Sequence, residues 1–178
     1  PGVNQAELAL IPPRSAELAH GKTPWGRFLR TRTIWLLWGQ YLCLNYGWYF
    51  YVTWLPTYLI EARGLTLQKG AFLAAFPLFF GGLGSLACGS LSVPLVRKLG
   101  SVPRVRRVLA MTGFMGAALG MFISPQIADP TLAMIVLGFA SFSNDLIMPS
   151  SWATCMDVGG KYAGTFSGSM NMMGAITA

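Results

Sequence analysis

The sequence has 178 residues, of which 53% are apolar and only 11% are charged, and its formal net charge is +7. This composition excludes an ordinary soluble domain, in which about 25% of residues are charged, and it indicates an integral membrane protein. The cations lie between apolar segments and form no single basic stripe, so we interpret them as topology signals and expect no nucleic-acid partner.

A polar segment, residues 1–33, opens the chain. It contains Pro12, Pro13 and His20 and several cations, so we expect a water-facing linker. Because the sequence starts with Pro1 and stops inside an apolar run, we expect a fragment and look for no signal peptide at residue 1.

Five apolar segments within residues 34–178 are predicted to be membrane-crossing helices of an all-α membrane fold. The first covers about 28 residues, or roughly 40 Å as a helix, which exceeds a hydrocarbon core of about 30 Å. The connections are short, so successive helices should run antiparallel. The predicted spans are residues 33–60, 70–96, 108–127, 131–156 and 162–178, the last one truncated.

Two features inside the spans could be mistaken for ligand motifs. Residues 81–85, GGLGS, lack the following Lys-Ser/Thr and the strand-turn-helix context of a phosphate loop, so we interpret them as a site of close helix approach. The cysteines at positions 43, 88 and 155 lack the spacing of a zinc site. We therefore expect neither a metal nor another cofactor.

Residues 143–171, SNDLIMPSSWATCMDVGGKYAGTFSGSMN, place polar side chains inside otherwise apolar sequence. Asp145 is the main example, because a carboxylate in hydrocarbon is costly unless it faces a partner or a water-filled cavity. Asn144 and Asp145 are therefore either a protonatable coupling site or a tie between helices, and the residues alone leave both open.

Helical wheels at about 100° per residue gather polar and aromatic residues on one side of two spans. They fall within about 140° on the first span and about 120° on the fourth, although Pro149 must disturb the register there. Each stripe should line either a helix contact or an aqueous cavity, where amides, hydroxyls and rings suit a small polyhydroxylated solute. The stripes are Gln40, Tyr41, Asn45, Trp48 and Tyr51, and Ser141, Asn144, Asp145, Ser151, Trp152 and Cys155.

Three runs of sequence resemble the anion:cation symporter branch of the Major Facilitator Superfamily, a group of sugar-acid and organic-anion transporters. They are PGVNQAELALI at residues 1–11, NYGWYFYVTWLPTYL at 45–59 and NDLIMPSSWATCMDVGGKYAGTFSGSMNMMG at 144–174. The resemblance covers essentially the whole chain. It implies helices seven to eleven of a twelve-helix protein, a partial carboxy-terminal six-helix bundle in the inner membrane, whose partner is the missing amino-terminal half.

The resemblance also implies a function, the secondary active transport of a small organic anion by alternating access. Such a carboxylated polyol would be a hexonate, hexarate or hexuronate, with a proton, or else sodium, as the coupling ion. A structural or sensory membrane module without transport is the alternative. By motif position the solute-facing residues would be Gln40, Asn45, Ser151, Trp152 and Asn171, and the stripe on the first span adds Trp48.

No enzyme is expected, because the only histidine, His20, lies in the linker with no carboxylate in obvious register. The resemblance places the main coupling acids in the amino-terminal half, so we favour the helix tie for Asn144 and Asp145.

One departure from the family concerns its loop signature, roughly G-x-L-S-D-x-L-x-R, which appears at residues 89–97 with Val93 in place of the acid. We expect Asp157, at the end of the fourth span, to pair with Arg97 or Lys98 and to act in a cytoplasmic gate. An exposed pair of this kind stabilises by only about 0–1 kcal/mol.

The distribution of cations predicts the orientation. All Lys and Arg residues except Arg63 and Lys69 fall on one side of the predicted bundle, so residues 1–33 and the loop 97–107 should be cytoplasmic. In a cysteine-free version of the complete protein, we expect a membrane-impermeant maleimide to label Thr66→Cys, but not Ser101→Cys, in intact cells. Labelling of Ser101→Cys from outside would refute this orientation.

Overall fold

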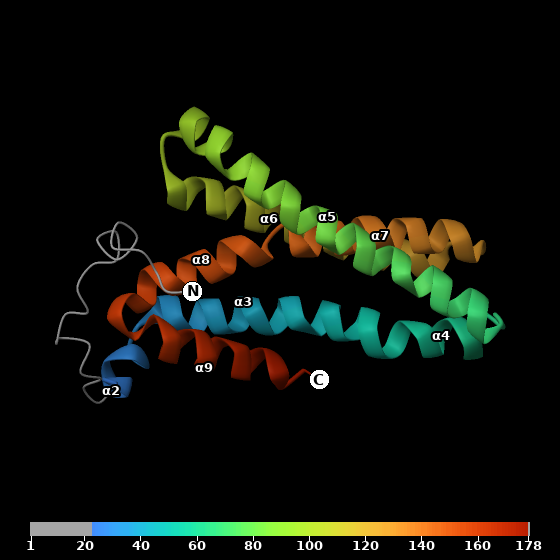
Figure 1. The fold of residues 1–178 in the computed structure, drawn as a ribbon, viewed down its shortest axis with the longest axis horizontal. Helices are drawn as coiled ribbons and strands as arrows, with labels where there is room; N and C mark the ends of the chain where they lie inside the picture. Colours follow the sequence, from blue (N-terminus) through green and yellow to red (C-terminus); the bar gives the residue numbers. More distant parts are fainter. Residues whose placement is uncertain (1–22, 178) are drawn as a thin grey trace, which may run out of the picture.

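The computed structural model describes residues 23–177, and within them every regular element is helical, as predicted (Figure 1). His20 and most of the predicted linker lie outside the described residues. The elements are α2 (Trp25–Phe28), α3 (Arg32–Tyr49), the π-helical segment η2 (Phe50–Trp54), α4 (Leu55–Glu61), α5 (Leu67–Leu99), α6 (Val102–Ile123), the 3₁₀ turn η3 (Ser124–Gln126), α7 (Pro130–Asp145), α8 (Met148–Gly159), the 3₁₀ turn η4 (Gly160–Tyr162) and α9 (Ala163–Ala175).

Three helical stretches of the described part are long and apolar enough to cross a membrane, namely 67–99, 102–126 and 130–175. The last stretch contains the fourth predicted span and most of the fifth. The chain reverses between them at Gly160, whose φ is +49°. The first predicted span does not meet the same test, but α3, η2 and α4 follow one another without a break over almost the predicted range.

The loop expected at residues 97–107 is much shorter than predicted. Helix α5 continues to Leu99 and α6 already begins at Val102, so the three arginines at positions 104, 106 and 107 lie on the first turns of α6. Gly100 makes this tight turn possible, since its φ of +66° is accessible to glycine at little cost. Pro103 is tolerated in the first helical turn, where no intrahelical N–H donor is needed.

The helices form two groups that α7 and α8 connect (Figure 1). Helices α3 and α4 form one long rod with α9 beside it, and the α5–α6 hairpin packs on α7. Toward the end where α8 turns into α9, the hairpin diverges from α8. One apolar core joins α3 to α8 and α9, and a second joins η2 and α4 to α5 and α7.

Small residues allow the hairpin to approach α7 closely. A Cβ added to Gly84 would overlap the backbone carbonyl group of Phe142, and one added to Gly81 would lie 2.6 Å from the Asp145 carboxylate. On α6, a Cβ at Gly113 would lie 2.5 Å from the Ile147 side chain. The interpretation of residues 81–85 as a site of close helix approach is therefore confirmed.

This packing predicts opposite outcomes for two neighbouring glycines. Gly84→Ala should destabilise the protein by about 1–3 kcal/mol, because the added methyl meets backbone that cannot rotate away. Gly82→Ala is the matched control, since a Cβ there meets nothing within 4 Å and alanine favours a helix by up to about 1 kcal/mol. Thermal unfolding in detergent measures both variants, and equal midpoints would contradict the packing argument.

Candidate functional site

The fourth predicted span breaks where its polar residues are concentrated. Helix α7 ends at Asp145 and α8 begins at Met148, with Pro149 in its first turn. Proline has no N–H, so the backbone carbonyl of Asp145 loses the donor that residue 149 would supply in a continuous helix. The hydroxyl of Ser85 on α5 donates to this carbonyl instead, at 3.3 Å. The disturbance expected at Pro149 is confirmed. The hydrogen bond from Ser85 on α5 offsets part of the free energy lost when the Asp145 carbonyl has no intrahelical donor.

The side chains of Asn144 and Asp145 lie between helices. Asn144 donates from Nδ2 to Asp145 Oδ1 at 3.2 Å and to the backbone carbonyl of Leu44 on α3 at 3.4 Å. Asp145 approaches α5 so closely that a Cβ at position 81 would force its carboxylate to move. The pair thus contacts α3 and α5 from α7, which is the geometry of the helix tie that we favoured over a coupling site.

Two residues of the predicted stripes meet directly. Gln40 Nε2 on α3 donates to Ser151 Oγ on α8 at 3.0 Å, and Ser151 Oγ donates to the carbonyl of Ile147 at 3.3 Å. Beside them is a small cavity of about 150 Å³, which the side chains of Arg106, Arg107 and Thr154 also line. An amide, hydroxyls and cations therefore share one space between α3, α6 and α8.

Aromatic residues of the same stripes also meet. The rings of Tyr41 and Trp152 make an edge-to-face contact with centroids 5.6 Å apart. Asn45 Nδ2 donates to the Tyr41 carbonyl at 3.0 Å, and its amide leaves room only for a glycine at position 174 of α9. Asn45 thus contributes to the α3–α9 contact in this structure.

Two predicted solute residues stand apart from this cluster. Trp48 is 39% exposed and makes an edge-to-face contact with its neighbour Tyr49. Asn171 is exposed on α9, and its side chain makes no hydrogen bond to another residue of the described part. The predicted site therefore divides into a packed group on α3 and α8 and two exposed side chains.

The predicted partner of Asp157 is wrong. Asp157 Oδ2 pairs with Arg106 Nη1 at 2.7 Å, and the same nitrogen donates to Thr154 Oγ1 at 3.2 Å. Arg97 and Lys98 lie exposed in the last turn of α5 instead. We missed Arg106 because it was expected in a loop, whereas the early start of α6 places it on a helix facing α8. Gly100 followed by Pro103 was the signal for that early start.

Two further contacts were not predicted. Trp38 Nε1 on α3 donates to Ser169 Oγ on α9 at 3.2 Å. Arg63, between α4 and α5, donates to the carbonyls of Ile127 and Ala128 and lies over the ring of Tyr58. Indole and guanidinium donors beside apolar spans are a signal for such contacts, but sequence alone does not identify their acceptors. Over residues 23–177, no group of three or more His, Cys, Asp or Glu side chains could hold a metal ion.

Comparison with known proteins agrees with the resemblance. Residues 4–178 match the family model described as Major Facilitator Superfamily. The chain is 36% identical over 159 residues to a probable sulfoacetate transporter of Cupriavidus necator. The aligned region covers 88% of this chain and 36% of the relative. It is 28% identical to a probable galactarate/D-glucarate transporter of Escherichia coli, over 99% of this chain and 42% of the relative.

A probable L-galactonate transporter of Escherichia coli is 32% identical over 72% of the chain and 28% of its own length. The chain thus spans between about a quarter and two fifths of the length of these relatives. The family assignment agrees with the expectation that the chain is no enzyme. With its apolar helices and a match over nearly its whole length, the chain is a multi-pass membrane protein segment that belongs to the Major Facilitator Superfamily.

Proposed function

We propose that the complete protein is a secondary active transporter of a small organic anion, and that a sugar acid is its solute. The observation that carries this proposal is the contact between the two polar stripes, where Gln40 meets Ser151 and Tyr41 meets Trp152 inside the bundle. The relatives named as organic-anion transporters support the same solute class. Sulfoacetate, from the name of one relative, is the second candidate solute.

The chemistry of the cluster fits a hydroxylated solute. The amide of Gln40 and the hydroxyl of Ser151 can each donate or accept, so both can exchange their mutual hydrogen bond for bonds to solute hydroxyls. The rings of Tyr41 and Trp152 offer apolar faces for carbon atoms. A site near the middle of the bilayer, shared with a second half of the protein, would allow alternating access by rocking of one half against the other.

The orientation in the proposal follows from the charges, and the coupling ion follows from the family resemblance. The end of the bundle with Arg97, Lys98 and Arg106 would face the cytoplasm of a cell whose inner membrane holds the protein, with residues 1–33 as the linker on that side. There the Arg106–Asp157 pair would act in the gate. A proton would be the coupling ion, and its main carboxylates would lie outside this chain.

Substitutions in the complete protein test the solute residues. Gln40→Ala and Asn171→Ala should each raise the KM for the transported anion by several-fold, because a hydrogen bond to the solute is worth about 0.5–3 kcal/mol. The matched control is Gln126→Ala, an exposed amide in η3 that should leave uptake unchanged. Uptake of labelled D-glucarate and of sulfoacetate is the measurement. Unchanged kinetics in both variants would show that these amides serve helix packing.

Asp145→Asn tests the role of the partly buried carboxylate. The amide keeps the size and hydrogen-bonding capacity of the tie but cannot titrate, so we expect the variant to retain pH-dependent transport that concentrates the solute. Accumulation in vesicles with an imposed pH gradient is the readout. If the variant equilibrates solute without concentrating it, Asp145 belongs to the coupling machinery.

A further inference from the structure

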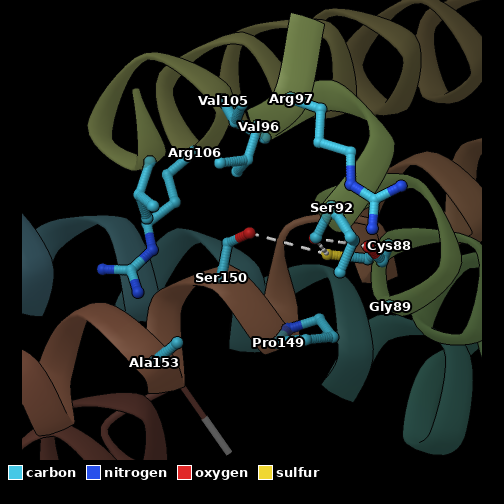
Figure 2. A pocket seen from close by; sticks show the side chains of 12 residues that line it. Cys88, Gly89, Ser92, Val96, Arg97, Val105, Arg106, Pro149, Ser150 and Ala153 are labelled. Atoms are coloured by element: carbon cyan, nitrogen blue, oxygen red, sulfur yellow. Dashed lines mark hydrogen bonds between the residues drawn. The ribbon is translucent and has the colours of Figure 1, made fainter. Parts of the chain in front are cut away.

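A cavity of about 440 Å³ lies between the α5–α6 hairpin and α8, where the hairpin diverges (Figure 2). Arg97 and Arg106 flank it, and no carboxylate lines it. Apolar side chains cover much of its wall, and hydroxyl and thiol groups lie at its inner end. The wall residues are Val93, Val96, Val102, Val105, Pro149 and Ala153, and the inner residues are Cys88, Ser92 and Ser150.

The positive charge of the cavity comes mainly from Arg97. Arg106 is neutralised in part by Asp157, through the same Nη1 atom that donates to Thr154, which leaves its other N–H groups available. Arg97 has no hydrogen-bond or ion-pair partner in the described part of the chain. Figure 2 shows the two guanidinium groups directed toward opposite sides of the cavity, so the guanidinium of Arg97 is the group that can bind the oxygens of a phosphate bidentately.

The polar groups at the inner end of the cavity already have hydrogen-bond partners within the protein. Ser92 Oγ donates to the Cys88 carbonyl at 2.5 Å, and the Cys88 thiol lies 3.5 Å from Ser150 Oγ, the contact drawn in Figure 2. These groups satisfy one another, so a free polyol would find few unpaired partners there. An occupant that is charged at one end and apolar at the other fits better.

The position in the helices favours a lipid. From Arg97 inward to Cys88 the cavity runs nine residues along α5, or about 14 Å, from the cation-rich end toward the middle of the span. Val93 and Val102 are 58% and 42% exposed, so its mouth is apolar as well as basic. Basic pockets between membrane helices are suited to anionic lipid headgroups.

We propose that this cavity binds the phosphodiester headgroup of an anionic phospholipid, with the phosphate at the guanidinium of Arg97 and the acyl chains along the valines. The loss of the acid at position 93 from the family signature is consistent with this role, because an Asp there would repel the phosphate. Arg106 and Ser150 line both this cavity and the small cavity beside Gln40 and Ser151, whereas Arg97 lines only this one. The test therefore uses Arg97 and measures lipid binding, which does not depend on transport.

Native mass spectrometry of the purified complete protein can test the proposal by titration with phosphatidylglycerol and, separately, phosphatidylcholine. Arg97→Gln should weaken phosphatidylglycerol binding about tenfold or more, because it removes charge-assisted hydrogen bonds to the phosphate in addition to one positive charge. Lys98→Gln is the matched control, since Lys98 is the adjacent cation outside the cavity, and it should change binding less than twofold. Arg97→Lys keeps the charge and should retain most of the binding.

Three results would overturn the proposal. Equal losses for Arg97→Gln and Lys98→Gln would indicate diffuse attraction to the surface. Phosphatidylcholine bound as tightly as phosphatidylglycerol would remove the role of charge. Displacement of phosphatidylglycerol by millimolar inorganic phosphate would make this a site for free phosphate. Because Arg97 is exposed, unfolding of its variants is not expected, and thermal midpoints would verify this.

Discussion

The missing N–H of Pro149 is the constraint on which the arrangement of this chain depends. A backbone carbonyl without a donor costs several kcal/mol in lipid, so a broken helix must be buried against neighbours that supply one. Ser85 supplies it here, and the glycines at positions 81 and 84 bring α5 close enough. The same approach encloses the Asp145 carboxylate. The break, the glycine contacts and the partly buried acid are therefore one structural unit.

The break also gives α8 its own direction, which brings Ser151 and Trp152 to Gln40 and Tyr41 on α3. Polar side chains inside lipid must have partners, and here the partners are one another. A solute that offers equivalent hydrogen bonds can replace them, because an amide and a hydroxyl can each donate or accept. Helix contact and solute binding are thus compatible roles for the Gln40–Ser151 pair.

The helical class and the glycine contact were predictable from sequence, because hydrophobic length and small residues have direct physical consequences in a membrane. The Asp157 pairing was not. It depends on whether residues 102–107 are loop or helix, and a run of arginines suggested a loop although Gly100 and Pro103 permit an immediate helix start. The helical wheel of the first span placed Asn45 in its polar stripe, and the family resemblance placed Asn171 toward the solute. Only the structure separates Asn45, packed against α9, from the exposed Asn171.

The central claim is that this chain is part of a carrier for organic anions, and competition in proteoliposomes tests it most directly. The complete protein would be reconstituted and supplied with a labelled hexarate, a labelled hexonate, sulfoacetate and a neutral hexitol of similar size. We expect at least one of the anions to accumulate above protein-free vesicles, and the hexitol neither to accumulate nor to compete. Uptake of the hexitol equal to that of the anions, or no uptake of any anion, would contradict the account.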